Sequence, residues 1–126
     1  MAKDTNFFDL LEWRLKSAIR VGSPARVVSF NSSTRTADIE LLFLTKYADG
    51  DTESQPIIED VPVIGMRYKS SLSDSSEMFY PSLQSGDRVW VNFADRALDN
   101  MDGINKFDPD YYRAHDIRDA VIVGIL

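Results

Sequence analysis

Residues 80–93, YPSLQSGDRVWVNF, contain a turn followed by the clearest strand signal in the chain. Gly86 can take a positive φ, and the polar side chains beside it can hydrogen-bond to nearby backbone, so a tight turn is expected. The following residues alternate between an inward and an outward set: Val89, Val91 and Phe93 against Arg88, Trp90 and Asn92. This period predicts a strand with one buried face. A large indole, Trp90, is left outside, where it needs a neighbouring segment or another subunit as a partner.

Upstream of this stretch, residues 4–20 have the pattern of a helix. An apolar side chain recurs at helical spacing, at Phe8, Leu11, Leu15 and Ile19. Gly22 and Pro24 end the pattern. Trp13 falls off this stripe, so it either wraps the edge of the stripe or touches a partner.

Between the helix and residue 64 the apolar period changes to two, which predicts three strands. We expect them over residues 25–30, 35–44 and 57–64, the first two joined as a hairpin. Pro62 cannot donate a ladder hydrogen bond, so the third strand should lie at an edge or carry a bulge.

The second of these strands departs from strict alternation near its end. Its inward set is Ala37, Ile39, Leu41 and Phe43. Leu42 and Leu44 place apolar groups on the other face, so we expect the helix or another chain to cover the strand there.

Polar segments connect the remaining strands. Residues 45–55 read as a polar loop, residues 67–76 as a serine-rich mobile excursion, and residues 99–116 as an aspartate-rich excursion. The final strand, residues 120–126, is apolar at nearly every position and is expected to be buried on both faces.

These elements predict a mainly β fold: a small five-stranded OB-fold-like barrel preceded by an N-terminal α-helix. We assign residues 1–22 to the helix and its lead-in and residues 23–126 to the barrel, within a single domain. A chain of 126 residues is long enough to bury one core.

Composition excludes several classes of function. With 14 basic and 20 acidic residues the net charge is −6, which disfavours binding to a phosphate backbone. The chain has no cysteine, hence neither disulfides nor thiolate metal sites. No apolar run is long enough for a membrane span, and the N-terminus is a poor signal peptide, so the cytoplasm of the producing cell is the expected site of synthesis.

No constellation of catalytic residues is present in the sequence. His115 is the only histidine, and no serine lies in a nucleophile-elbow pattern. The aspartates from Asp99 to Asp110 lack the ligand spacing of an EF-hand. We therefore expect no enzyme activity, no cofactor and no metal site.

Seven segments together resemble a known family. They are ARVVSF (25–30), TADIEL (36–41), IEDVPV (58–63), FYP and SGDRVWV (79–81 and 85–91), FADRALD (93–99) and RAHDIRDAV (113–121). In this order they resemble the N-terminal domain of the membrane-puncturing central spike proteins of contractile-tailed bacteriophages. The resemblance covers the chain from about Leu11 to its end.

The resemblance implies a homotrimeric OB-fold that caps the tail tube beneath the baseplate hub, in the virion. It also implies contacts with hub and tail-tube proteins and only indirect contact with the host outer membrane. The β-helical needle that follows this domain in the family has no counterpart in this sequence. The needle is then a separate spike-tip protein, or the chain is a fragment, or the chain is a cap and adaptor only. We expect Leu42, Leu44, Trp90 and Trp13 to lie in subunit or partner contacts.

Two other readings remain open. An OB-fold can bind single-stranded nucleic acid or oligosaccharide through a basic groove with aromatic side chains. Tyr68, Trp90 and Phe93 with nearby basic residues could form such a groove, although the acidic total disfavours it. A small cell-wall hydrolase is the third reading, and the missing catalytic dyad makes it the weakest.

Overall fold

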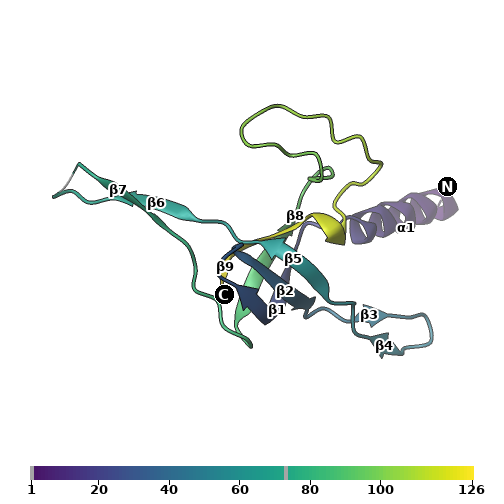
Figure 1. Ribbon diagram of the computed structural model, residues 1–126. Coiled ribbons are helices and arrows are strands. Elements are labelled where there is room, and N and C mark those ends of the chain that lie inside the picture. Colours follow the sequence, from purple (N-terminus) through teal and green to yellow (C-terminus); the bar gives the residue numbers. More distant parts are fainter. Residues whose placement is uncertain (1, 73) are drawn as a thin grey trace.

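The structure describes residues 2–72 and 74–126; Met1 and Ser73, the latter within the predicted serine-rich excursion, lie outside the described residues. In this computed structural model the chain forms a helix, a small curled sheet and two short hairpins (Figure 1). The elements are α1 (Ala2–Ala18), β1 (Gly22–Asn31), β2 (Thr36–Leu41), β3 (Thr45–Lys46), β4 (Thr52–Glu53), β5 (Ile58–Pro62), β6 (Met66–Lys69), β7 (Ser76–Phe79), β8 (Arg88–Phe93), the 3-10 helix η1 (Ile117–Asp119) and β9 (Ala120–Ile125).

Five strands form an antiparallel sheet in the order β5-β2-β1-β8-β9. The sheet curls until its two edges meet: Val63 forms a parallel bridge with Ile122, and the amide of Ile64 donates to the carbonyl of Ile122 at 3.0 Å. A five-stranded, partly open Greek-key barrel of this kind is an OB-fold. The predicted fold class, mainly β with an N-terminal helix, is confirmed. Pro62 lies in the edge strand β5, where its missing N–H costs no ladder bond inside the sheet.

The turn before β8 locks onto the bulge of β1. Gly86 has a φ of 95°, and its amide donates to the carbonyl of Val27 at 2.8 Å. The amide of Val27 in turn donates to the carbonyl of Asp87 at 2.9 Å, beside the point where the β1–β2 register shifts. The turn and the bulge therefore satisfy each other's backbone hydrogen-bonding groups. These two hydrogen bonds set the register of β8 against β1.

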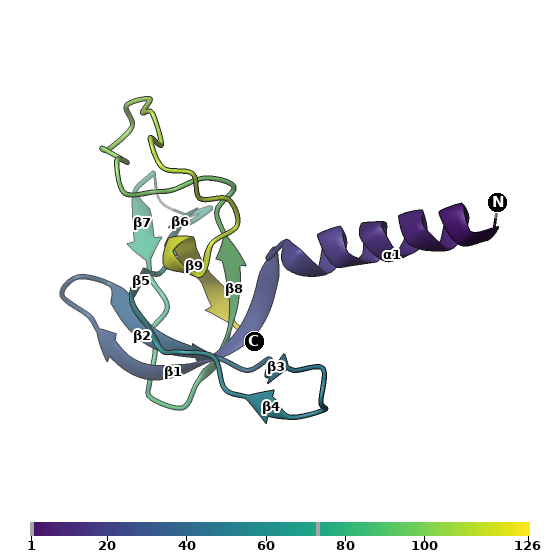
Figure 2. The same cartoon turned by 90° about the vertical axis from the view of Figure 1, so that its right-hand side faces the viewer.

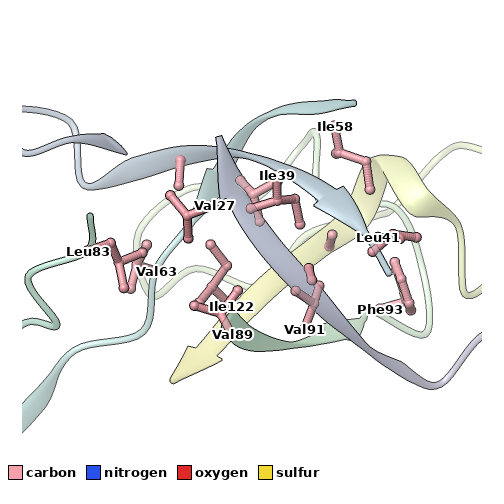
Figure 3. Close-up of a cluster of buried hydrophobic side chains, with 14 residues drawn as sticks. Val27, Ile39, Leu41, Ile58, Val63, Leu83, Val89, Val91, Phe93 and Ile122 are labelled. Carbon is pink, nitrogen blue, oxygen red and sulfur yellow. The ribbon is translucent and has the colours of Figure 1, made fainter. Parts of the chain in front are cut away.

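Alternating side chains from the five strands fill the barrel (Figure 3). The largest fully buried ones are Ile39, Ile122, Val27, Val89 and Val91. In β8 the inward set predicted from the sequence is buried and the outward set is exposed. Leu83, from the segment before the turn, closes one end of the core.

The last strand is less buried than its sequence predicts. Ala120 and Ile122 are buried, but Ile125 and Leu126 are each 57% exposed. Only the first half of β9 lies between β8 and residues 63–64, so its second half has no neighbour on one side. The expectation of burial on both faces along residues 120–126 is therefore wrong for the end of the strand.

Candidate assembly interface

Helix α1 projects away from the barrel (Figure 2), and no core residue comes from it. The large apolar side chains described in α1 are exposed by 42% to 66%: Phe7, Phe8, Leu10, Leu11, Trp13 and Leu15. The Glu12–Lys16 ion pair, at 2.8 Å, supports its polar side. A lone helix of 17 residues is still marginal in water. Its apolar surface, including Trp13 at 66% exposed, therefore lies open to a partner.

The expected strand over residues 35–44 ends early, at Leu41. The amide of Leu42 still donates to the carbonyl of Pro24, at 3.0 Å, and the chain then bends away from the sheet. Phe43, expected inward, is 57% exposed, and Leu42 and Leu44 are exposed beside it. The expected loop 45–55 is instead the short hairpin β3–β4. The bend thus gathers three large apolar side chains at the base of an acidic hairpin.

Two side chains fix this bend. The side-chain Nε2 of Gln55 donates to the carbonyl of Phe43 at 2.9 Å, and Arg20 donates to the Gln55 side-chain oxygen at 2.8 Å. The end of α1, the bend and the segment after β4 are thereby tied together. A shallow cavity of about 430 Å³ lies at this junction, lined partly by Ile19, Leu41 and Phe93.

The expected mobile excursion over residues 67–76 is a second hairpin, β6–β7. Every residue of its two strands is exposed. Opposite residues share a face, so the register puts Met66, Tyr68 and Phe79 on one side. The Tyr68 and Phe79 rings meet edge to face at 5.8 Å. This apolar face continues into a groove beside Ile64 and Val123 on the barrel.

Trp90, the outward indole of β8, has a neighbour within its own chain. Its ring lies over Gly22, where an added Cβ would approach the indole to 2.6 Å, and its Nε1 donates to Asn92 Oδ1 at 3.0 Å. Of the two partners expected for Trp90, a neighbouring segment or another subunit, the segment at Gly22 therefore covers part of the indole. The ring remains 37% exposed, so a subunit contact for Trp90 stays a prediction.

The long acidic loop between β8 and η1 is held by one buried ion pair. Arg113, 10% exposed, donates from Nε and Nη2 to the two carboxylate oxygens of Asp119, at 3.1 and 2.8 Å. Asp119 is 1% exposed and also accepts from the amide of Leu98 at 3.1 Å. The guanidinium bonds to Asp119 and then Asp99 raise the pKa of Arg113, and the Arg113 bond lowers the pKa of Asp99.

The described residues show little that could serve catalysis. His115 has a φ of 50°, and its Nε2 lies 3.4 Å from Asp95 Oδ1 while its amide donates to the carbonyl of Ala94. These contacts hold the end of the loop against the start of it. Within residues 2–72 and 74–126, no group of three or more histidines and carboxylates is placed to hold a metal ion.

The apolar face of β6–β7 does not follow from the sequence, which predicts a mobile excursion over residues 67–76. In β6, Met66, Arg67, Tyr68 and Lys69 alternate between apolar and basic, but β7 reads Ser76, Glu77, Met78 and Phe79, which does not alternate. Four residues are a short run, and the serines between the strands masked the pairing. Leu42, Leu44, Trp90 and Trp13 are all at least partly exposed, but they lie on three separate elements rather than in one site.

Comparison with known families places the chain among phage proteins. Residues 23–124 match the phage protein Gp138 N-terminal domain. The chain belongs to this family. The match begins one residue into β1 and ends within β9, so it spans the whole barrel, both hairpins and the acidic loop. Helix α1 lies outside it. No curated protein matches the chain.

Membership in the Gp138 N-terminal domain family confirms the resemblance found in the sequence. It makes the chain a phage structural protein, associated with the virion. Among the described helices, none is both long and apolar enough to cross a bilayer.

Proposed function

We propose that the chain is a trimeric spike or hub-cap protein of a phage tail baseplate. In this role it closes the end of the tail tube and carries or attaches a membrane-puncturing spike. The family match over residues 23–124 supports a place in the virion. The assembly role is supported by the number of large apolar side chains that are exposed on elements projecting from the barrel.

This exposed surface is more than scattered apolar residues would produce. Large apolar side chains are exposed on α1, on the 42–44 bend, on β6–β7 and on the acidic loop, while the core stays closed. Contiguous exposed apolar surface marks interaction sites in soluble proteins. An adaptor at the end of a tube needs several such sites, for its own copies and for the parts above and below it. Closed three-fold symmetry would cover each site by repetition of the same contact.

The test is the mass of the purified chain in solution. Light scattering should give three times the 14.3 kDa of one chain, and mixing with the hub or tail-tube protein of the same phage should give a larger complex. Leu42→Asp with Leu44→Asp should dissociate the trimer. Ile104→Asp, at a fully exposed position on the acidic loop, is the matched control and should leave it intact. A chain that stays monomeric at all concentrations and binds no tail protein would remove the proposal.

A further inference from the structure

Two arginines face each other on the outer surface of the barrel. Arg26 of β1 and Arg88 of β8 are directly opposite residues in the antiparallel pairing of these two strands. Side chains at such positions share one face of the sheet, with their Cβ atoms roughly 5 Å apart. Arg88 belongs to the exposed set of β8, and the side chain of Arg26 is 56% exposed. Because like charges directly opposite each other destabilise a sheet, an anion between these two arginines would stabilise it.

Only one of the two arginines is neutralised within the chain. Arg26 Nη2 donates to Glu40 Oε2 at 2.6 Å, from the neighbouring strand β2. In the parts of the chain that the structure describes, residues 2–72 and 74–126, the Arg88 side chain has neither an ion pair nor a hydrogen bond. This cation is unpaired although the chain contains 20 acidic residues.

Two more carboxylates are close to the pair in the sheet or in the sequence, and hydrogen bonds hold both of them elsewhere. Asp38 of β2 accepts from the hydroxyl of Ser29 and from the amide of Asp60, each at 3.1 Å. Asp87, in the turn before β8, accepts from the amide of Gln84 at 2.8 Å. The unpaired arginine is therefore left opposite a residue of its own charge.

An apolar strip lies beside the arginine pair on the same face. Trp90 follows two residues after Arg88 in β8 and is 37% exposed. Pro24 of β1 is the residue opposite Trp90. The surface thus combines two guanidinium groups with apolar side chains. An aspartate or glutamate side chain can contact both parts, because it carries its carboxylate on an aliphatic stem.

We propose that Arg26 and Arg88 form a binding site for a carboxylate, supplied by an aspartate or glutamate side chain of a neighbouring copy of this chain. The planar guanidinium of Arg88 donates two hydrogen bonds to the carboxylate. Arg26 contributes the N–H groups that Glu40 does not use. The bound carboxylate lies between two like charges and removes their repulsion. This proposal rests on the proposed trimer and names one contact within it.

A second copy is the source of carboxylates that the composition favours. The chain has 20 acidic against 14 basic residues, so acidic side chains are in excess on every copy. Copies with a net charge of −6 repel one another, and electrostatic attraction between them has to come from places where a cation meets an anion. An arginine without a partner in its own chain provides such a place. In a closed ring each copy supplies one site and one carboxylate, so every site is filled.

Arg88→Gln tests the site, because it removes one charge and keeps a polar side chain at an exposed position. The trimer of this variant should be weaker by about ten-fold or more, as expected when a hydrogen-bonded charge pair is lost. Light scattering over a dilution series measures this change. At concentrations where the chains are dissociated, the urea midpoint of the variant should equal or exceed the native one, because the variant relieves the repulsion from Arg26.

Inorganic phosphate tests the site independently of the source of the carboxylate. Phosphate should compete for the two arginines and dissociate the native trimer more than chloride does at the same ionic strength. The trimer of Arg88→Gln should show no difference between the two salts. Lys106→Gln makes the same charge change on the acidic loop and is the matched control, which should behave as the native chain does in both experiments.

The outcomes separate this contact from the trimer itself. A trimer of native strength in Arg88→Gln, a lowered urea midpoint of its dissociated chain, or equal effects of phosphate and chloride on the native trimer would each overturn the carboxylate site. The proposed trimer would stand in all three cases. A native chain that is monomeric at all concentrations would instead remove the proposed function.

Discussion

Contacts of particular glycine and arginine residues hold the segments that connect the strands of this barrel in place. Gly22 and Gly65 have no positive φ; each is needed because an aromatic ring lies where a Cβ would be. Arg35 lies over the Tyr80 ring and so attaches the segment after β7 to the β1–β2 turn, while Arg113 pairs with Asp119 and so attaches the acidic loop to the start of β9. Individual side chains therefore hold segments that have few backbone bonds to the barrel.

Gly65→Ala should destabilise the protein and loosen the β6–β7 hairpin. The new Cβ would lie 2.4 Å from a Tyr80 ring carbon, so the ring must move away from Arg35. Overpacking of this kind costs about 1–3 kcal/mol of unfolding free energy. Gly124→Ala is the control, because a Cβ there meets nothing within 4 Å. Urea unfolding of both variants measures the difference, and equal midpoints would contradict the close contact with Tyr80.

Arg113→Leu should cost far more than Arg118→Leu, although both remove an arginine that is ion-paired to aspartate. The first leaves Asp119 buried without its partner, and breaking a buried pair costs about 3–5 kcal/mol. The second breaks an exposed pair with Asp116, where Arg118 is 63% exposed, and such pairs contribute about 0–1 kcal/mol. Denaturant unfolding compares them. Similar losses for the two variants would mean that Asp119 is not buried as the structure has it.

At the scale of elements, the acidic loop ends in a cap that depends on pH. Asp116 caps η1, accepting from the amide and the guanidinium of Arg118. The side-chain bond to Arg118, and then the backbone bond, lower the pKa of Asp116 from its ordinary 3.8 to about 2. A depressed carboxyl pKa contributes stability that is present above the ordinary value and is lost as the pH falls toward the folded value.

Asp116→Asn should therefore be less stable than the native chain above pH 4, and the gap should close between pH 4 and pH 2. The comparison is made with urea midpoints of the two proteins at a series of pH values. Asp108→Asn, on the same loop, serves as the control. A gap that stays constant down to pH 2 would show that the Asp116 carboxylate does not stabilise the fold through its charge.

Helix α1 is the element that contributes least to the free chain. Leu11→Ala and Leu15→Ala should each change the unfolding free energy of the barrel by less than about 0.5 kcal/mol, as exposed positions do. Ile39→Ala, at a fully buried position, should cost about 2–5 kcal/mol. Urea unfolding at low protein concentration, monitored by the β-sheet signal, gives both numbers. A large loss from the helix variants would mean that α1 packs on its own barrel.

Burial explains which elements can be predicted from the sequence. β8 is predictable because Val89, Val91 and Phe93 face a core and therefore alternate with polar residues. β6 and β7 have no buried face within the chain, so nothing in the barrel enforces a pattern longer than four residues. The second strand is predicted too long because Leu42 and Leu44 extend its apolar run. They lie in an exposed bend, where the proposed assembly contact would account for them.

At the scale of the whole molecule, the two hairpins and the acidic loop are insertions between the strands of the partly open barrel. β3–β4 and β6–β7 both interrupt the chain between barrel strands, and the acidic loop interrupts it between β8 and β9. The core residues keep the barrel folded, which leaves the exposed insertions available for the proposed assembly contacts. Leu42 and Leu44 show this division, since they directly follow the last buried residue of β2.

The same arrangement predicts that the chain does not bind single-stranded nucleic acid. OB-folds that bind oligonucleotides commonly use the loop between their fourth and fifth strands, which here is the loop of residues 94–116. That loop holds six aspartates against Arg96, Lys106 and Arg113, and Arg113 is already committed to Asp119 and Asp99. With a net charge of −6 the molecule repels phosphate at low salt, where attraction would be strongest.

A filter-binding assay with labelled single-stranded DNA in about 10 mM salt should show no retention, because at that ionic strength the screening length is about 30 Å and repulsion acts over the whole protein. Retention that added salt abolishes would reveal a basic groove on the barrel and return the binding-module reading to first place.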